Sequence, residues 1–443
     1  MNVLSPEARA GRFALPGAHF AVATCYLVAA AAGLVWIAPQ LAAGDFASPR
    51  VAGVTHLFTL GWLTTTIFGA LYQLMPNAMA APIRWPRVGW ASLAVFAPGV
   101  GAFALGVARG AAVAEYLGIC LVALGVALTV GNVAATLPRA RRRDEMWAGI
   151  AIAITYLSAA LVLGALLFHN LRTGDLAAAR VRVLATHLHV AIVGWVLVMI
   201  VGVSHRLLPM FLIARGADTR WTRRALASLA AGVPILGVGF LTHRAPVAWV
   251  GAAVLDLGIA FFLYQASCFV RARVRKRIDI GMRYAGVGVS FLALAAALGP
   301  IVLWRRPLSM RLATTYVLLG LLGGIVMFVI GLFYKIVPML AWTARYGGQA
   351  KPNVPTIAEM FSERVARAQL VLMTGAILAI AGAILSGSSI GARIGAAAFL
   401  VGVLLFGSQI LRVALGRPSR RHEPDELAAP RPGRSARAVV TRV

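Results

Sequence analysis

The strongest constraint in this sequence is a series of apolar stretches, each long enough to cross a bilayer, that follow one another almost from end to end. A membrane-spanning helix needs about 20 predominantly apolar residues, because the hydrocarbon core is about 30 Å thick. The sequence therefore predicts an all-α polytopic membrane protein with about twelve spans. We place them at 17–38, 51–76, 88–108, 112–136, 147–168, 184–210, 224–242, 247–270, 282–304, 312–341, 366–387 and 389–412.

Composition supports a membrane protein over a soluble one. Hydrophobic residues make up 60% of the 443-residue chain and charged residues only 13%. A soluble protein of this size needs far more polar side chains to cover its surface. The lipid bilayer is therefore the expected partner of most of the surface.

The formal net charge of +28 does not indicate nucleic-acid binding, because the cations lie between the apolar segments. We interpret them as residues that fix the orientation of the chain in the membrane. Arginine-rich groups occur at 139–143, 215–224 and 271–277. Such groups mark the cytoplasmic side of a membrane, where anionic lipids attract them. We expect both termini to be cytoplasmic, most simply in a bacterial inner membrane, and we expect no nucleic-acid partner. The basic, proline-rich segment 416–443 is expected to be a disordered cytoplasmic tail.

Three spans share one pattern of glycine, ring-bearing residue and proline. In each, a glycine lies seven residues before a proline and an aromatic or imidazole ring lies four before it. The three prolines are separated by 133 and 129 residues, which corresponds to four helices each time. This spacing predicts three quasi-equivalent four-helix repeats, at approximately 17–136, 147–270 and 282–412. The matched residues are Gly69, Tyr72 and Pro76, then Gly202, His205 and Pro209, then Gly331, Tyr334 and Pro338.

Histidines mark the most probable site, because superposing the repeats places His56 and His189 at equivalent positions. His187 lies two residues before His189 on the same predicted helix. Polar rings at membrane depth are costly unless they are paired or ligated, and imidazole nitrogen is a good axial ligand for haem iron. Positions 187 and 189 are separated by about 200° around a helix, so their rings can face two different cofactors. The alternative is hydrogen bonding between helices without a cofactor.

On these residues the chain resembles the catalytic subunit of haem-copper oxidases and its smaller NnrS-type relatives, which are haem- and copper-containing membrane proteins associated with nitric oxide metabolism. The resemblance rests on the twelve spans in three groups and on the stretches 55–57, 71–76, 186–189 and 206–209. It implies that His56 and His189 are the axial pair of a low-spin b-type haem. His187 would then face a second cofactor, such as a five-coordinate haem.

The sequence also departs from the oxidase pattern. The oxidases carry the histidine pair on the tenth helix, whereas this chain carries it on the sixth, and its tenth span has Tyr316 and Leu318 at the aligned positions. The copper-binding histidines of the oxidases have no counterparts on spans six and seven. Copper therefore remains a candidate cofactor without a full ligand set.

Two further residues are candidates. Asp256 is an acid about ten positions into the eighth span, where a charged carboxyl is costly, so we expect a proton-transfer role or a neutral acid bonded to a neighbouring helix. His169, at the outer end of the fifth span, is a possible additional ligand.

Three functions stay open at this point. The first is a haem-containing protein that acts in respiratory electron transfer or responds to nitric oxide or oxygen, with respiratory-chain proteins as partners. The second is a proton-coupled transporter, because repeats, proline-broken helices and a membrane-buried acid also occur in transporters. The third is a cofactor-free subunit for respiratory assembly. The sequence alone leaves enzymatic turnover undecided.

Overall fold

The computed structural model describes residues 6–176, 179–216, 218–274, 276–305, 307–347 and 354–416, and the side chains from residue 13 onward. Within these ranges it contains twelve helical spans long and apolar enough to cross a membrane, as predicted. The expected tail beyond residue 416 lies outside the described residues. The spans are α1 (Pro6–Ala43), α2–η1–α3 (Pro49–Ala78), α4 (Pro86–Arg109), α5–η2 (Ala112–Arg139), α6 (Glu145–Thr173), α7–η3–α8 (Arg180–Leu212), α9 (Arg220–Leu241), α10 (Ala245–Arg271), α11 (Ile280–Trp304), α12–η4–α13 (Met310–Tyr346), α14 (Glu363–Ser386) and α15 (Ser389–Leu415), and a short 3₁₀ turn, η5 (Ile357–Met360), precedes α14.

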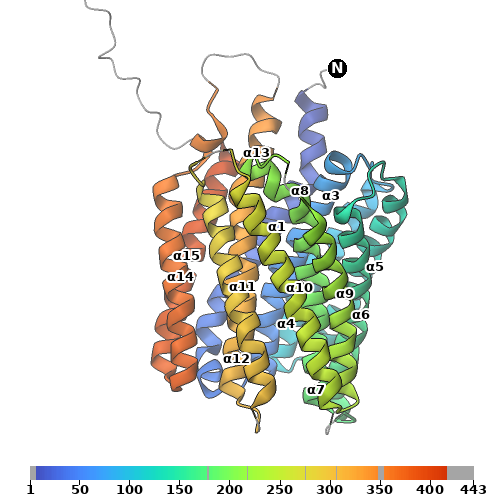
Figure 1. Ribbon diagram of the computed structural model, residues 1–443, viewed down its shortest axis with the longest axis vertical. Coiled ribbons are helices and arrows are strands. Elements are labelled where there is room, and N and C mark those ends of the chain that lie inside the picture. The colour runs from blue at the N-terminus through green and yellow to red at the C-terminus, as the bar shows by residue number, and fades with distance from the viewer. Residues whose placement is uncertain are drawn as a thin grey trace, which may run out of the picture.

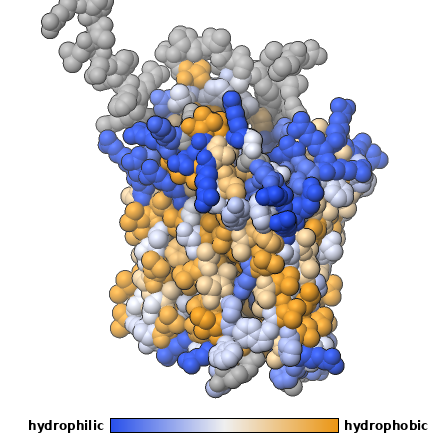
Figure 2. Space-filling model, in the orientation of Figure 1, coloured by the Kyte–Doolittle hydropathy of each residue, from blue (hydrophilic) through white to orange (hydrophobic). Residues whose placement is uncertain are grey.

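The helices stand roughly parallel in one bundle, with the described ends of α1 and α15 at the same face (Figure 1). On the face shown in Figure 2, apolar side chains form a band across the middle of the bundle, and hydrophilic side chains gather toward its two ends. Backbone groups inside a bilayer must be satisfied within the segment, which is why every span is a helix. Local capping sets where several helices begin: the side chains of Ser48, Asp144, Asp279, Ser309, Ser362 and Ser388 each accept a backbone N–H from the first turn.

The second, sixth and tenth spans form the interior of the bundle. They bury 67%, 56% and 78% of their most apolar windows, against 22–50% for the other nine described spans. Each also contains a π-helical segment: η1 (Leu57–Thr64), η3 (His189–Leu197) and η4 (Leu319–Val326). Such segments are rare and frequently occur at functional sites. Their common place in the three spans follows the repeat predicted from the prolines.

One glycine contact recurs in all three repeats. A Cβ at Gly61, Gly194 or Gly323 would lie 2.6 Å from the ring Cγ of an aromatic residue on the preceding span. Only a glycine therefore lets the central helix approach that ring so closely. The aromatic partners are Tyr26, Tyr156 and Phe291.

A second contact also recurs, between the fourth helix of each repeat and the start of the third. A side-chain amide oxygen on the fourth helix accepts a backbone N–H at that start. The backbone N–H of Trp85 donates to Asn132 at 3.1 Å, that of Thr222 donates to Gln265 at 3.2 Å, and that of Ser362 donates to Gln409 at 2.8 Å. The three four-helix repeats are thus built with the same internal packing.

Candidate functional site

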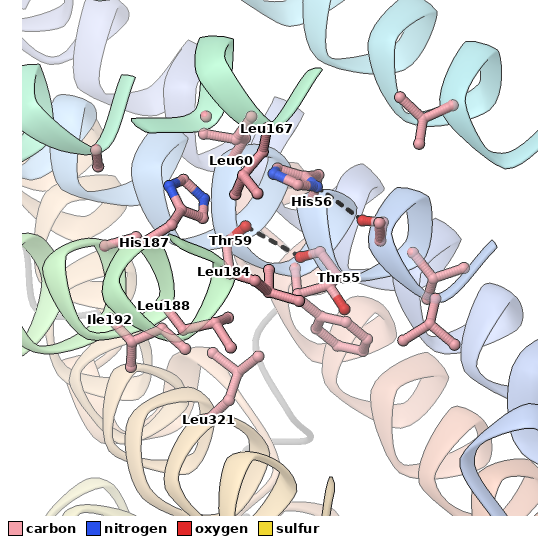
Figure 3. Close-up of a pocket in the computed structure, with 18 of the residues that line it drawn as sticks. Thr55, His56, Thr59, Leu60, Leu167, Leu184, His187, Leu188, Ile192 and Leu321 are labelled. Atoms are coloured by element: carbon pink, nitrogen blue, oxygen red, sulfur yellow. Dashed lines mark hydrogen bonds between the residues drawn. The ribbon is translucent and has the colours of Figure 1, made fainter. Parts of the chain in front are cut away.

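A first cavity of about 240 Å³ lies where the first repeat meets the second. His56 at the end of α2 and His187 near the end of α7 (Arg180–Leu188) both line it. Figure 3 shows the two imidazoles projecting from their helices toward one another. The cavity therefore joins two titratable rings from segments that lie 131 residues apart in the chain.

The geometry of these rings suits two ligands on one metal ion. Their centroids are 6.4 Å apart and their planes differ by 32°. An imidazole nitrogen lies about 2 Å from a bound metal and about 1 Å from its ring centre, so two imidazoles on opposite sides of one ion have centroids about 6 Å apart. The observed separation leaves room for a metal between the rings.

Local hydrogen bonding fixes the His56 ring for this role. Its Nδ1–H donates to the Ala52 carbonyl one turn earlier, at 2.7 Å. The other nitrogen, Nε2, is then the atom with a free lone pair, as in metal-bound histidines whose second nitrogen bonds a carbonyl. Phe103 packs edge-on against the same ring at 5.1 Å and restricts its rotation.

His187 is held less by hydrogen bonds and more by packing. Its Nδ1 is buried and makes no hydrogen bond of ordinary geometry within the described residues, although the Ala160 carbonyl on α6 lies nearby. Gly164 on α6 makes space for the ring, since a Cβ there would lie 3.3 Å from Cε1 of His187. Packing against α6 therefore positions this imidazole.

The rest of the first cavity has mostly apolar walls, including Leu60, Leu184 and Leu321 (Figure 3). Arg180, at the first turn of α7, also lines it and donates to the Ala47 carbonyl at 3.0 Å. Apolar walls with one cation at their edge suit an apolar ligand that carries an acidic group, with that group at Arg180.

A second cavity, of about 520 Å³, lies where the second repeat meets the third. His189, Tyr316 and Asp256 line it from η3, α12 (Met310–Leu318) and α10. The His189 Nδ1–H donates to the Ala185 carbonyl at 2.8 Å, so its Nε2 accepts a hydrogen bond from the Tyr316 hydroxyl at 3.3 Å. The two rings stack with centroids 6.2 Å apart.

The structure brings His187, and not His189, beside the ring of His56. The centroids of the His56 and His187 rings are 6.4 Å apart, whereas His189 lines the second cavity. Equivalent residues meet across a twofold axis, whereas around a threefold axis each repeat presents one surface to the next and a different surface to the previous one. Because His56 and His189 hold equivalent positions in a threefold arrangement, they are not expected to face each other.

The same rule explains the second cavity. The proline offsets make His189 the counterpart of His56 and Tyr316 the counterpart of His187. The pair His189–Tyr316 is thus the repeat-equivalent of the pair His56–His187. Tyr316 and Arg180 were not among the expected site residues, and applying the repeat offset in a cyclic sense would have identified Tyr316.

The remaining candidates divide between the second cavity and the surface. Asp256 lines the second cavity. The His169 side chain is 64% exposed and pairs with Asp175 at 3.2 Å, outside the linings of both cavities. Among the described residues, no group of three or more His, Cys, Asp or Glu side chains could hold a metal ion. Two imidazoles in an apolar wall fit a metal whose other ligands come from an organic ring, which is the donor set of haem.

Comparison with known proteins identifies the fold of the chain but not its activity. The sequence matches no protein-family model and no curated protein. The structure is similar to a cryo-EM structure of a haem-copper terminal oxidase dimer, with a TM-score of 0.67, 11% sequence identity, and coverage of 93% of this chain and 85% of that chain. At such low identity the likeness concerns the fold alone. The described part of the chain is therefore a membrane protein of twelve helical spans with the fold of a haem-copper oxidase.

Proposed function

We propose that the chain is a haem-binding integral membrane protein whose first cavity holds one b-type haem between His56 and His187. The observation that carries the proposal is the pair of imidazoles, 6.4 Å apart, that meet across the boundary of two repeats. Their separation matches two axial ligands, and the fixed tautomer of His56 leaves Nε2 available. The oxidase-like fold supports the proposal because the similar protein is, by its description, a haem-copper enzyme.

The residues of the first cavity would have separate tasks. His56 and His187 would hold the iron, the Ala52 carbonyl would keep His56 in the binding tautomer, and Arg180 would meet the haem carboxylates. A bound haem would supply one-electron chemistry or a site for a diatomic gas. With His56 and His187 both as ligands, a bound haem would be suited to electron transfer, because the protein would leave no free position for a gas.

We place this activity in respiratory electron transfer or in the response to nitric oxide or oxygen, at a bacterial inner membrane with both termini in the cytoplasm. The cationic loops between the spans support that orientation. His189 lines the second cavity, and neither His189, His169 nor a copper ion enters the proposed haem site.

The proposal is tested by a pyridine haemochrome spectrum and the iron content of protein purified from cells grown with ample haem. We expect about one b-type haem per chain. A content below about a tenth of an iron per chain would reject haem binding, because a site with two axial histidines retains its haem through purification.

A further inference from the structure

The Asp256 carboxyl in the second cavity has no place in the haem site proposed above. It lies on α10, eleven residues after the helix starts at Ala245, which places it about 17 Å into the span. Within the described ranges of the chain, no hydrogen bond or ion pair reaches this carboxyl. A carboxyl at such depth normally has a partner, so the cavity has one strong acceptor that the protein leaves open.

Tyr316 adds a second open acceptor. Its hydroxyl donates its proton to His189 Nε2, because the Nδ1–H of His189 is already bonded to Ala185. The lone pairs of the Tyr316 oxygen remain free. His189 itself is neutral and satisfied at both nitrogens, so a ligand in this cavity would meet acceptors rather than donors at this depth.

Aromatic rings surround the same space. Phe240 packs against His189 with ring centroids 5.7 Å apart, and Tyr316 stacks on His189 with centroids 6.2 Å apart. All three residues line the cavity. Aromatic faces attract a cation that lies within about 6 Å of the ring centre. A carboxylate together with aromatic rings is the combination that recognises a positive charge on an apolar molecule.

The positive side chains of the cavity lie near the end of the bundle where α7 and α10 begin. Arg182 is seven residues before His189 on the same helix, about 10 Å away along its axis, and His243 lies in the loop before α10. Neither reaches the Asp256 carboxyl in an ion pair. The negative charge is therefore separated from the positive ones by apolar wall.

We propose that the second cavity is a binding site for an apolar protonated amine, with its ammonium group at Asp256 and Tyr316 and its apolar body among the aromatic and aliphatic walls. The cavity volume of about 520 Å³ suits a small aromatic amine. The site does not depend on haem in the first cavity. A ligand of this class partitions into the bilayer and needs only one charge and one donor group to be recognised.

The test compares three matched probes on haem-poor protein in lipid nanodiscs, with empty nanodiscs subtracted: 4-butylbenzylamine, 4-butylbenzyl alcohol and butylbenzene. Isothermal titration should show saturable binding of one amine per chain. The alcohol, which keeps the donor but not the charge, should bind at least about tenfold more weakly, and butylbenzene weaker still. Equal binding of the three probes, or no saturable binding, would overturn the proposal.

Variants locate the charge that is recognised. Asp256→Asn should weaken amine binding at least about tenfold, and Tyr316→Phe severalfold. Asp175→Asn removes an exposed carboxylate outside the cavity and should leave amine binding unchanged. Asp256→Glu keeps the charge and should keep the preference for amine over alcohol, which retains a test if the Asn variant fails to fold. Wild-type affinity in Asp256→Asn would contradict the site.

Haem-replete protein separates this proposal from a second haem. One haem per chain that persists in His189→Ala agrees with an amine site. Two haems per chain, one of them lost in His189→Ala, would show that the second cavity holds haem instead and would overturn the amine site. Absence of any haem with intact amine binding would reject only the function proposed for the first cavity.

Discussion

The two cavities occupy equivalent boundaries between repeats, yet they present different chemistry. The first has an imidazole on each side, His56 and His187, whereas the second has an imidazole and a phenol, His189 and Tyr316. The backbone setting is closely similar, since η1 and η3 begin within one residue of the corresponding point of each span. The repeat therefore produces a similar cavity at each boundary, and the side chain at one position determines what the cavity can bind. This position is His187 at the first boundary and Tyr316 at the second.

The boundaries also differ in how they are joined. Trp195 on η3 donates a hydrogen bond from Nε1 to the Thr64 hydroxyl on η1 at 3.1 Å, and both residues are buried. The residues at the corresponding positions of the second boundary are Leu197 and Gly324, which offer no side-chain hydrogen bond. The first boundary therefore has a buried hydrogen bond between its two repeats that Leu197 and Gly324 cannot make, and the second cavity has more than twice the volume of the first.

The largest expected effect comes from removing either ring of the first cavity. His56→Ala and His187→Ala should each abolish the low-spin haem spectrum, because six-coordinate iron needs both axial ligands. Reduced-minus-oxidised absorbance of detergent-purified protein measures this directly. His189→Ala is the matched control from the same helix and should keep the spectrum. Loss of the low-spin bands in His189→Ala with retention in His187→Ala would restore the pairing of His56 with His189.

The next effect is a gain rather than a loss. Tyr316→His converts the second cavity to the pair of imidazoles found in the first, because position 316 is the counterpart of position 187. We expect the variant to bind one additional low-spin haem when it is made in haem-replete cells. Haem and protein quantified together would show a rise from about one to about two haems per chain. An unchanged content would mean that the ligand pair alone does not define the first site.

A smaller effect is expected at the wall behind His187. Gly164→Ala places a Cβ 3.3 Å from Cε1 of that ring, so the imidazole must shift by a few tenths of an ångström. Changes that re-aim a ligand in this way lower metal affinity by about tenfold or more. Haem titration into haem-poor protein would measure the loss. Gly375→Ala on α14 is a suitable control, since a Cβ there meets nothing within 4 Å, and wild-type affinity in Gly164→Ala would contradict the packing role.

The smallest effect concerns the hydrogen bond that closes the first boundary. Thr64→Val removes the acceptor of Trp195 and should lower the free energy of unfolding by about 0.6 kcal/mol, the usual scale for a hydrogen bond between membrane helices. Unfolding in mixed detergent micelles measures it. Thr155→Val is the comparison, because the exposed Thr155 hydroxyl bonds only within its own helix. Equal destabilisation of the two variants would remove the special role of the first boundary.

The sequence predicted the membrane class and the twelve spans, because the length of an apolar segment is a direct consequence of bilayer thickness. It also predicted that His187 and His189 face different sites, since helix geometry fixes that angle. The partner of His56 did not follow, because it depends on which surface of one repeat meets the next. That information lies in contacts such as Gly164 against His187, between residues far from the histidine motif itself.

The central claim is that His56 and His187 hold one haem iron between them. Electron paramagnetic resonance of the oxidised, haem-replete wild-type protein tests it most directly, with near-infrared magnetic circular dichroism to identify the ligands. We expect a single low-spin ferric haem per chain with two imidazole ligands. A colourless protein, or a haem that is wholly high-spin with one imidazole, would contradict it.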